Sequence, residues 1–187
     1  MFEYLKSKKK NVQLIREPGG VKISEAIRNI LLDVKNTAMS RECETLLYMA
    51  ARAQLVEEVL APALEKGAVV LCDRFLDSTV AYQGYGNGVD INFIKQVGRV
   101  ATQGIQPDLT FLFDIEPEKG LSRTGRQKDR IEKRPLSYHQ KVRQGYLALA
   151  KEEPSRVKVI LVDKDKDAIF EIVRKSVDAL LSCQTNF

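Results

Sequence analysis

Short apolar runs alternate with longer amphipathic stretches along most of the chain. The apolar runs are NVQLI at 11–15, AVVLCD at 68–73, LTFLFD at 109–114 and VKVILVD at 157–163, and each has the length of a β-strand. Three of them are almost continuously apolar, which is typical of parallel strands covered by helices on both faces. The pattern predicts an α/β fold with a doubly wound parallel sheet, which binds its ligands at the carboxyl ends of the strands.

The amphipathic stretches predict helices between and around these strands. A long helix is expected over 41–66, with a kink or break at Pro62 and a stop at Gly67. One apolar helix face is expected to consist of Ile23, Ala26, Ile27, Ile30 and Leu31. Further helices are expected at 2–6, 90–103, 136–153 and 165–182.

Length and composition indicate a single domain over 1–187 with a sizeable core. The sequence is 44% hydrophobic and 29% charged, which excludes disordered and collagen-like proteins. It has neither a membrane-spanning apolar run nor a secretory signal, so we expect a cytoplasmic protein without a membrane partner. Cys43, Cys72 and Cys183 lie far apart, which argues against a disulfide or zinc framework, and the single His139 excludes a multi-histidine metal site.

The net charge of +5 is concentrated in one segment, 119–134. This segment has seven basic and two acidic residues, whereas the remaining 23 basic and 23 acidic residues balance. It predicts a mobile lid that closes over an anionic ligand. A solvated charged loop is the more ordinary alternative. Nucleic-acid binding is a weaker one, because no aromatic residues are interleaved with the charges.

Two strand ends carry candidate chemistry. The strand AVVLCD ends in Asp73, the arrangement in which a Walker-B carboxylate organises magnesium and phosphate oxygens, and Arg74 beside it can grip a phosphate. Asp at a strand end is also common for solubility or helix capping. The strand NVQLI is followed by the loop 16–20, Arg-Glu-Pro-Gly-Gly, whose glycines let backbone approach a ligand, or simply form a tight turn.

Two pairs of residues have the i, i+4 spacing that places side chains next to each other on a helix. Tyr48 and Arg52 could stack a base and hold a phosphate, and Thr79 and Gln83 could hydrogen-bond a pyrimidine edge, with Tyr82 between them. Core packing, helix capping and surface exposure are the alternatives for these side chains. Residues 84–88 predict a flexible glycine-rich turn after the second pair.

Several motifs, in order over nearly the whole chain, resemble the bacterial thymidylate kinase family. They are REPGGV…IR at 16–28, LLYMAARAQ at 46–54, LCDRFLDSTVAYQGYG at 71–86, PDLTFLFD at 107–114, DRIE at 129–132 and HQKVRQGYLALA at 139–150. The resemblance implies a P-loop nucleoside-monophosphate-kinase fold and a homodimer that does not bind nucleic acid. It also implies transfer of a phosphoryl group from ATP to dTMP, with magnesium, to give dTDP for dTTP biosynthesis. A kinase for another nucleotide is the alternative within the same class.

The resemblance also implies roles for individual residues. Glu17 and Pro18 would line the dTMP site, and Arg28, Arg52 and Arg74 would surround the phosphate and sugar of dTMP. Tyr48 would stack on thymine, Thr79 and Gln83 would contact the base, and Tyr82 would close over the deoxyribose. Asp73 would act on magnesium indirectly. The lid arginines, of which one would reach the transferring phosphate, would be Arg123, Arg126 and Arg130.

One family feature is absent from the 187 residues: the glycine-rich P-loop GxxxxGK[ST] and the strand before it. We therefore expect an N-terminal truncation of about 20 residues, the length of a strand, a loop and half a helix. In the family fold this central first strand lies between the strands ending at Asp73 and Asp114, so we expect an empty slot there. A natural nucleotide-binding protein without a P-loop and without kinase activity is the alternative, and its sheet would close up directly.

Overall fold

The computed structural model describes residues 1–123, 127–163 and 165–184. All four predicted strands are confirmed to within two residues at each end. They are β1 (Val12–Arg16), β2 (Val69–Asp73), β3 (Thr110–Asp114) and β4 (Val157–Leu161).

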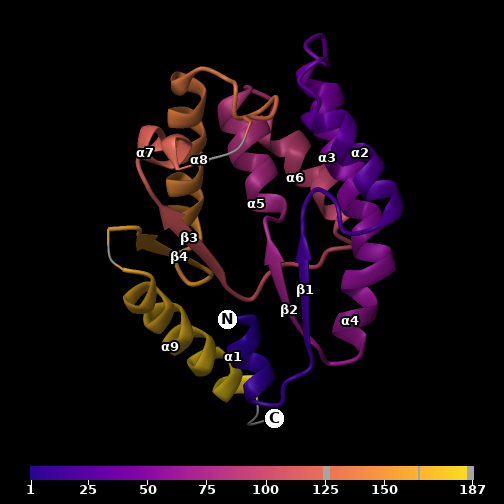
Figure 1. Ribbon diagram of the computed structural model, residues 1–187. Helices are drawn as coiled ribbons and strands as arrows, with labels where there is room; N and C mark the ends of the chain where they lie inside the picture. The colour runs from indigo at the N-terminus through magenta and orange to yellow at the C-terminus, as the bar shows by residue number, and fades with distance from the viewer. Residues whose placement is uncertain (124–126, 164, 185–187) are drawn as a thin grey trace.

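The strands form two parallel pairs (Figure 1). β1 pairs with β2 in a register that places Leu14 opposite Leu71, and β3 pairs with β4 with Leu112 opposite Val159. Within the described ranges, β2 has no ladder to β3, so each keeps one edge without a strand partner. The sheet has therefore not closed up between them.

Two helices from the ends of the chain cover one face of both strand pairs. They are α1 (Phe2–Ser7) and α9 (Lys166–Gln184), and Figure 1 shows them together below the strands. Leu5 and Val173 belong to an apolar cluster that also contains β2 and β3 side chains. The Tyr4 hydroxyl donates a hydrogen bond to Asp178 Oδ1 over 2.8 Å, which fastens α1 to α9. This layer joins the two pairs into one core.

The opposite face of β1 and β2 is covered by a long interrupted helix. It runs through α3 (Arg41–Leu55), the π-helical turn η1 (Val56–Leu60) and α4 (Ala61–Glu65). The predicted long helix is confirmed, and Pro62 lies in the first turn of α4, where the π-helical turn has just ended. α2 (Lys22–Leu32) lies beside α3, where the buried Ser24 hydroxyl donates to the Ala51 carbonyl over 2.7 Å.

The apolar face predicted for α2 is wrong at three of its five positions. Ile23 and Ile30 are about half exposed, at 51% and 47%, and Ala26 is exposed as well, whereas Ser24 and Leu31 are buried. Helical spacing shows which apolar residues share a face but not what covers that face. Here α2 turns its Ser24 and Leu31 side towards α3 and leaves an apolar surface outside.

The remaining helices connect the two strand pairs. These helices are α5 (Leu76–Thr79), η2 (Val80–Gly86), α6 (Ile91–Ala101), α7 (Pro117–Ser122) and α8 (Leu136–Glu152). α8 packs against β3 and β4, η2 packs on α8, and α6 packs on α3 and η2. The flexible turn predicted from Gly84 is wrong for Gly84 and Gly86, which belong to the π-helical η2. The reason is packing: a Cβ on Gly86 would lie 2.6 Å from the Tyr138 ring of α8, so only glycine permits this approach.

Candidate active site

The carboxyl ends of β1 and β2 meet and bring the two predicted loops together. Arg16 lies opposite Asp73 in the ladder, and the Glu17 N–H donates to the Asp73 carbonyl over 3.0 Å. The loop that begins at Glu17 therefore starts beside Asp73 and Arg74. Glu25, in the first turn of α2, accepts from the Gly20 N–H over 2.7 Å and holds this loop.

A buried ion pair forms the centre of the site. Arg52 of α3 donates through Nε to Glu17 Oε2 over 2.8 Å, and its Nη1 donates to the Thr79 hydroxyl over 3.1 Å. All three side chains are buried. Burial raises the pKa of Glu17, and the neighbouring Arg52 opposes that rise. The pair links the loop after β1 to α3 and α5, and it forms the buried base of the site.

Arg74 has an unusual backbone for a residue with a side chain. Its φ is +70°, in the left-handed region that favours glycine, and such conformations gather at functional sites. The guanidinium carbon lies 5.1 Å from the centre of the Tyr82 ring, within range of a cation–π contact. Tyr146 supports this arrangement from α8, because its hydroxyl donates to Ser78 Oγ over 2.7 Å. The sequence did not single out Tyr146.

Arg28 of α2 approaches the same loop from the other side. Its Nη1 donates to the Pro18 carbonyl over 2.8 Å, and the side chain is half-buried. Burial, and next the charge of Arg16, lower the pKa of Arg28. A guanidinium that is partly desolvated and next to a second cation gains most from an anion. Arg28 is therefore a cationic group of this region that suits an anionic ligand.

Tyr48 and Gln83 lie on the remaining walls. Tyr48 is half-buried on α3, and burial raises the pKa of its hydroxyl far above the usual value. Gln83 is buried in η2 and donates through Nε2 to Glu44 Oε1 over 2.9 Å. Glu44 was missed in the sequence. Its spacing of four residues from Tyr48 and eight from Arg52 was the signal that could have found it.

The basic segment is less free than the sequence suggested. Arg123 is exposed at the end of α7, and Arg126 lies outside the described residues. Arg130 instead contacts the body of the protein: its Nε donates to the Leu31 carbonyl over 2.7 Å and its Nη2 lies 2.7 Å from Glu44 Oε2. Ile131, next to it, is buried and serves as an apolar anchor. A phosphate contact by any of these arginines stays a prediction.

Two features of the described residues bear on other classes of protein. The described part of the chain contains no group of three or more His, Cys, Asp or Glu side chains arranged to hold a metal ion. Among its helices, none combines the length and the apolar character needed to cross a membrane.

The site and fold together define a class. Parallel strands flanked by helices place arginines, a strand-end aspartate and a tyrosine at one edge of the sheet, which is the arrangement of α/β proteins that bind phosphorylated ligands. The family model for thymidylate kinase matches residues 1–173.

Individual relatives agree with this match. The thymidylate kinase of Thermoanaerobacter sp. (strain X514) is 47% identical over 179 residues, which cover 92% of this chain and 87% of that protein. The thymidylate kinase of Symbiobacterium thermophilum is 43% identical over 182 residues, with 97% and 85% covered. The crystal structure of thymidylate kinase from Ehrlichia chaffeensis superposes with a TM-score of 0.77 at 31% identity, covering 94% of this chain and 87% of that one. The chain belongs to the thymidylate kinase family.

Proposed function

We propose that this chain serves, in the cytoplasm, the transfer of a phosphoryl group from ATP to dTMP, which gives dTDP. The observation that carries the proposal is the loop after β1, which contacts Arg28 through the Pro18 carbonyl, hydrogen-bonds to β2 immediately before Arg74, and contains the Glu17 of the buried Glu17–Arg52 pair. Two accessible guanidiniums on a rigid floor suit a monophosphate, because each can donate two hydrogen bonds to its oxygens.

The roles of the remaining residues follow their positions around this floor. Arg52 and Glu17, buried and paired, hold the site in shape and border the sugar together with Pro18. Tyr48 offers a ring for stacking on the base, and Thr79 and Gln83 offer polar groups to its edge. Tyr82, already under the Arg74 guanidinium, closes over the deoxyribose. In such a reaction the protein contributes positioning and charge stabilisation, and Arg123 would neutralise the transferring group.

Magnesium suits the exposed carboxylate that ends β2. Asp73 is exposed at the carboxyl end of β2, next to Arg74. Mg²⁺ prefers carboxylate oxygens, keeps several waters and is often held by one or two carboxylates together with substrate phosphates. When bound, it would neutralise charge on the phosphates. Asp73 would orient it, directly or through water.

The phosphates of ATP need a cradle that the 187 residues do not contain as a sequence motif. We infer that a strand carrying a glycine-rich phosphate loop belongs between β2 and β3. Both strands have a free edge there within the described chain, and Leu14 and Phe113, at the carboxyl halves of β1 and β3, are 56% and 49% exposed. A strand in this position would satisfy the unpaired backbone groups, and the residues after it would cover these side chains.

The test is turnover of dTMP with magnesium and ATP. Residues 1–187 are expected to bind dTMP but to transfer phosphate negligibly, whereas the same residues preceded by a strand and a GxxxxGK[ST] loop are expected to form dTDP. Equal turnover by both proteins would contradict the need for the loop. Binding without turnover by both would favour the alternative, a nucleotide-binding protein that is not a kinase.

A homodimer is also part of the proposal. Ile23 and Ile30 on α2 and Leu46 on α3 are each about half exposed, and these two helices lie side by side at the right of Figure 1. Ile23 and Ile30 are seven residues apart and share one helix face. An apolar surface on adjacent helices favours association, and a second copy of the chain would bury it.

A further inference from the structure

Glu44 has more charged and polar partners than any role proposed above requires. Its side chain is fully buried at 0% exposure. Oε1 accepts from Gln83 Nε2 over 2.9 Å and from Asn87 Nδ2 over 2.7 Å. Oε2 lies 2.7 Å from Nη2 of both Arg130 and Arg134. One carboxylate of α3 thus joins η2 to the C-terminal end of the basic segment.

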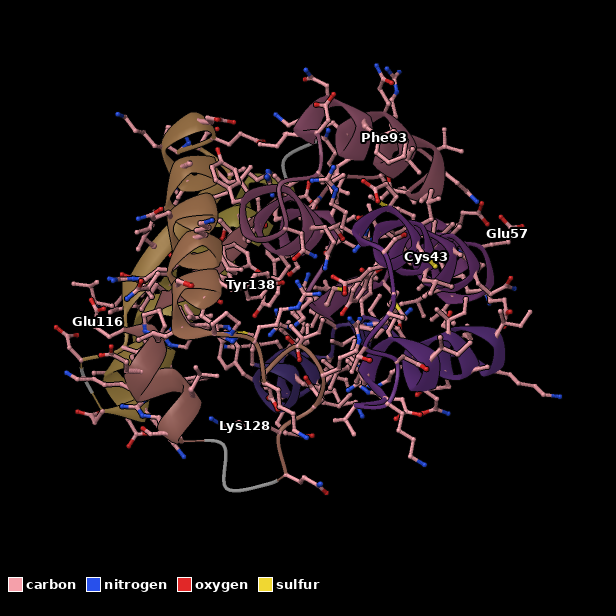
Figure 2. The ribbon with its side chains drawn as sticks, turned by 90° about the horizontal axis from the view of Figure 1, so that it is seen from above. Cys43, Glu57, Phe93, Glu116, Lys128 and Tyr138 are labelled. Atoms are coloured by element: carbon pink, nitrogen blue, oxygen red, sulfur yellow. The ribbon has the colours of Figure 1, made fainter. Side chains whose placement is uncertain are left out.

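The two arginines fasten that end of the segment to further elements. The backbone N–H of Arg130 donates to the Leu32 carbonyl, at the end of α2, over 3.2 Å. Arg134 also donates to Asn87 Oδ1, and its guanidinium carbon lies 4.6 Å from the centre of the Tyr138 ring. Figure 2 looks down on this region, with Tyr138 on α8 facing the centre of the molecule and Lys128 at its edge. Residues 127–134 are therefore attached to α2, α3 and α8 through Arg130 and Arg134.

The strength of this attachment follows from burial. A carboxylate in the interior is costly unless charged partners and hydrogen bonds compensate it. Releasing Arg130 and Arg134 would leave Glu44 with two amide donors and no cation, so the attached state is strongly favoured. Glu44, Tyr48 and Arg52 are spaced by four residues and share one face of α3. The attachment at Glu44 therefore lies on the same helix face as the proposed nucleotide-binding residues Tyr48 and Arg52.

We propose that Glu44 is a positioning residue: it fastens residues 127–134 to the body of the protein, holds Gln83, and so fixes residues 127–134 beside the proposed monophosphate site. Only the expected effect on dTMP binding rests on the proposed function. The attachment itself exists in the free protein and can be measured without a nucleotide.

The first test is limited trypsin digestion of the free protein, with cleavage sites identified by mass spectrometry. Glu44→Gln keeps the shape of the side chain but removes the charge, and cleavage after Lys128, Arg130 and Lys133 is expected to become several-fold faster. Glu42→Gln is the matched control, because Glu42 is an exposed glutamate of the same helix whose ion pair is with the neighbouring Arg41. The control is expected to be digested like the wild type.

Arg134→Gln removes a cationic partner of Glu44 and tests the same attachment if the Glu44→Gln protein does not fold. It is expected to expose the same bonds, and the double variant is expected to be cleaved more slowly than the product of the two single effects, because both remove one shared contact. Unchanged cleavage in both single variants would overturn the proposal. So would acceleration spread over the whole chain with a lower urea midpoint, which indicates general destabilisation.

The second test is calorimetric titration with dTMP. Glu44→Gln is expected to weaken binding about tenfold, which corresponds to one charge-assisted contact, while Glu42→Gln leaves it unchanged. Unchanged affinity in a Glu44→Gln protein with faster local cleavage would overturn the positioning role. A wild-type protein that does not bind dTMP would contradict the proposed function instead, and the digestion would still decide the attachment.

Discussion

Glu17 and Arg52, 35 positions apart, form an ion pair of 2.7 Å between Oε2 and Nη2 with side chains only 4% and 2% exposed. Arg52→Met leaves the Glu17 carboxylate buried without its cation, so we expect a loss of about 3–5 kcal/mol in the free energy of unfolding. Arg28→Met is the comparison, because Arg28 is half-buried and lies against a carbonyl rather than a carboxylate. Urea unfolding measures both, and equal losses would contradict the structural role of Arg52.

Removal of Arg143 should have an effect that depends on pH. Its Nε and Nη2 donate to Asp114 over 2.6 and 2.9 Å and lower the pKa of that carboxyl. A carboxyl with a lowered folded pKa stabilises the fold above its unfolded pKa, and this contribution disappears as pH falls through the folded pKa. Arg143→Gln should therefore cost about 1–3 kcal/mol at pH 7 and less below about pH 4. Urea unfolding at pH 7 and pH 3 that gives the same difference from the wild type would refute this.

The strands were predictable because parallel strands covered on both faces are nearly continuous apolar runs. β2 and β3 each end at the aspartate that ends the run, Asp73 and Asp114. The π-helical turns η1 and η2 were not predictable, because helical periodicity assumes i→i+4 bonding throughout. Thr79 and Gln83 are both buried, and their surroundings depend on Arg52 and Glu44, which come from another part of the chain. Glu44 itself looks like a solvent-facing residue of an amphipathic helix until Arg134, 90 positions later, is brought against it.

Arg74 and Lys133 are both cations near the proposed site, but their surroundings differ. Arg74→Ala removes a guanidinium that can grip phosphate at the strand ends and should weaken dTMP binding by about 2–4 kcal/mol. Lys133 is an exposed residue, and Lys133→Ala should cost less than about 1 kcal/mol. Fluorescence or calorimetric titration with dTMP compares the two. Similar losses would contradict the roles assigned here.

The exposed apolar surface of α2 and α3 is expected to hold two copies of the chain together as a dimer. Ile30→Glu puts a charge into that surface and should shift the protein from dimer to monomer in light scattering after size exclusion. Ile172→Glu on α9, where the side chain is 37% exposed, is the control on a different helix and should leave the mass unchanged. A wild-type protein that is monomeric at all concentrations would exclude the dimer.

Residues 1–187 are proposed to carry the monophosphate site of a thymidylate kinase, and calorimetric titration with dTMP and with thymidine decides whether they do. The two ligands share base and sugar, so their difference isolates the phosphate that Arg28 and Arg74 are proposed to hold. We expect saturable binding of one dTMP per chain, at least about tenfold tighter than thymidine because charge-assisted hydrogen bonds to the phosphate are lost with the nucleoside. No saturable binding of dTMP, or equal affinity for both ligands, would contradict it.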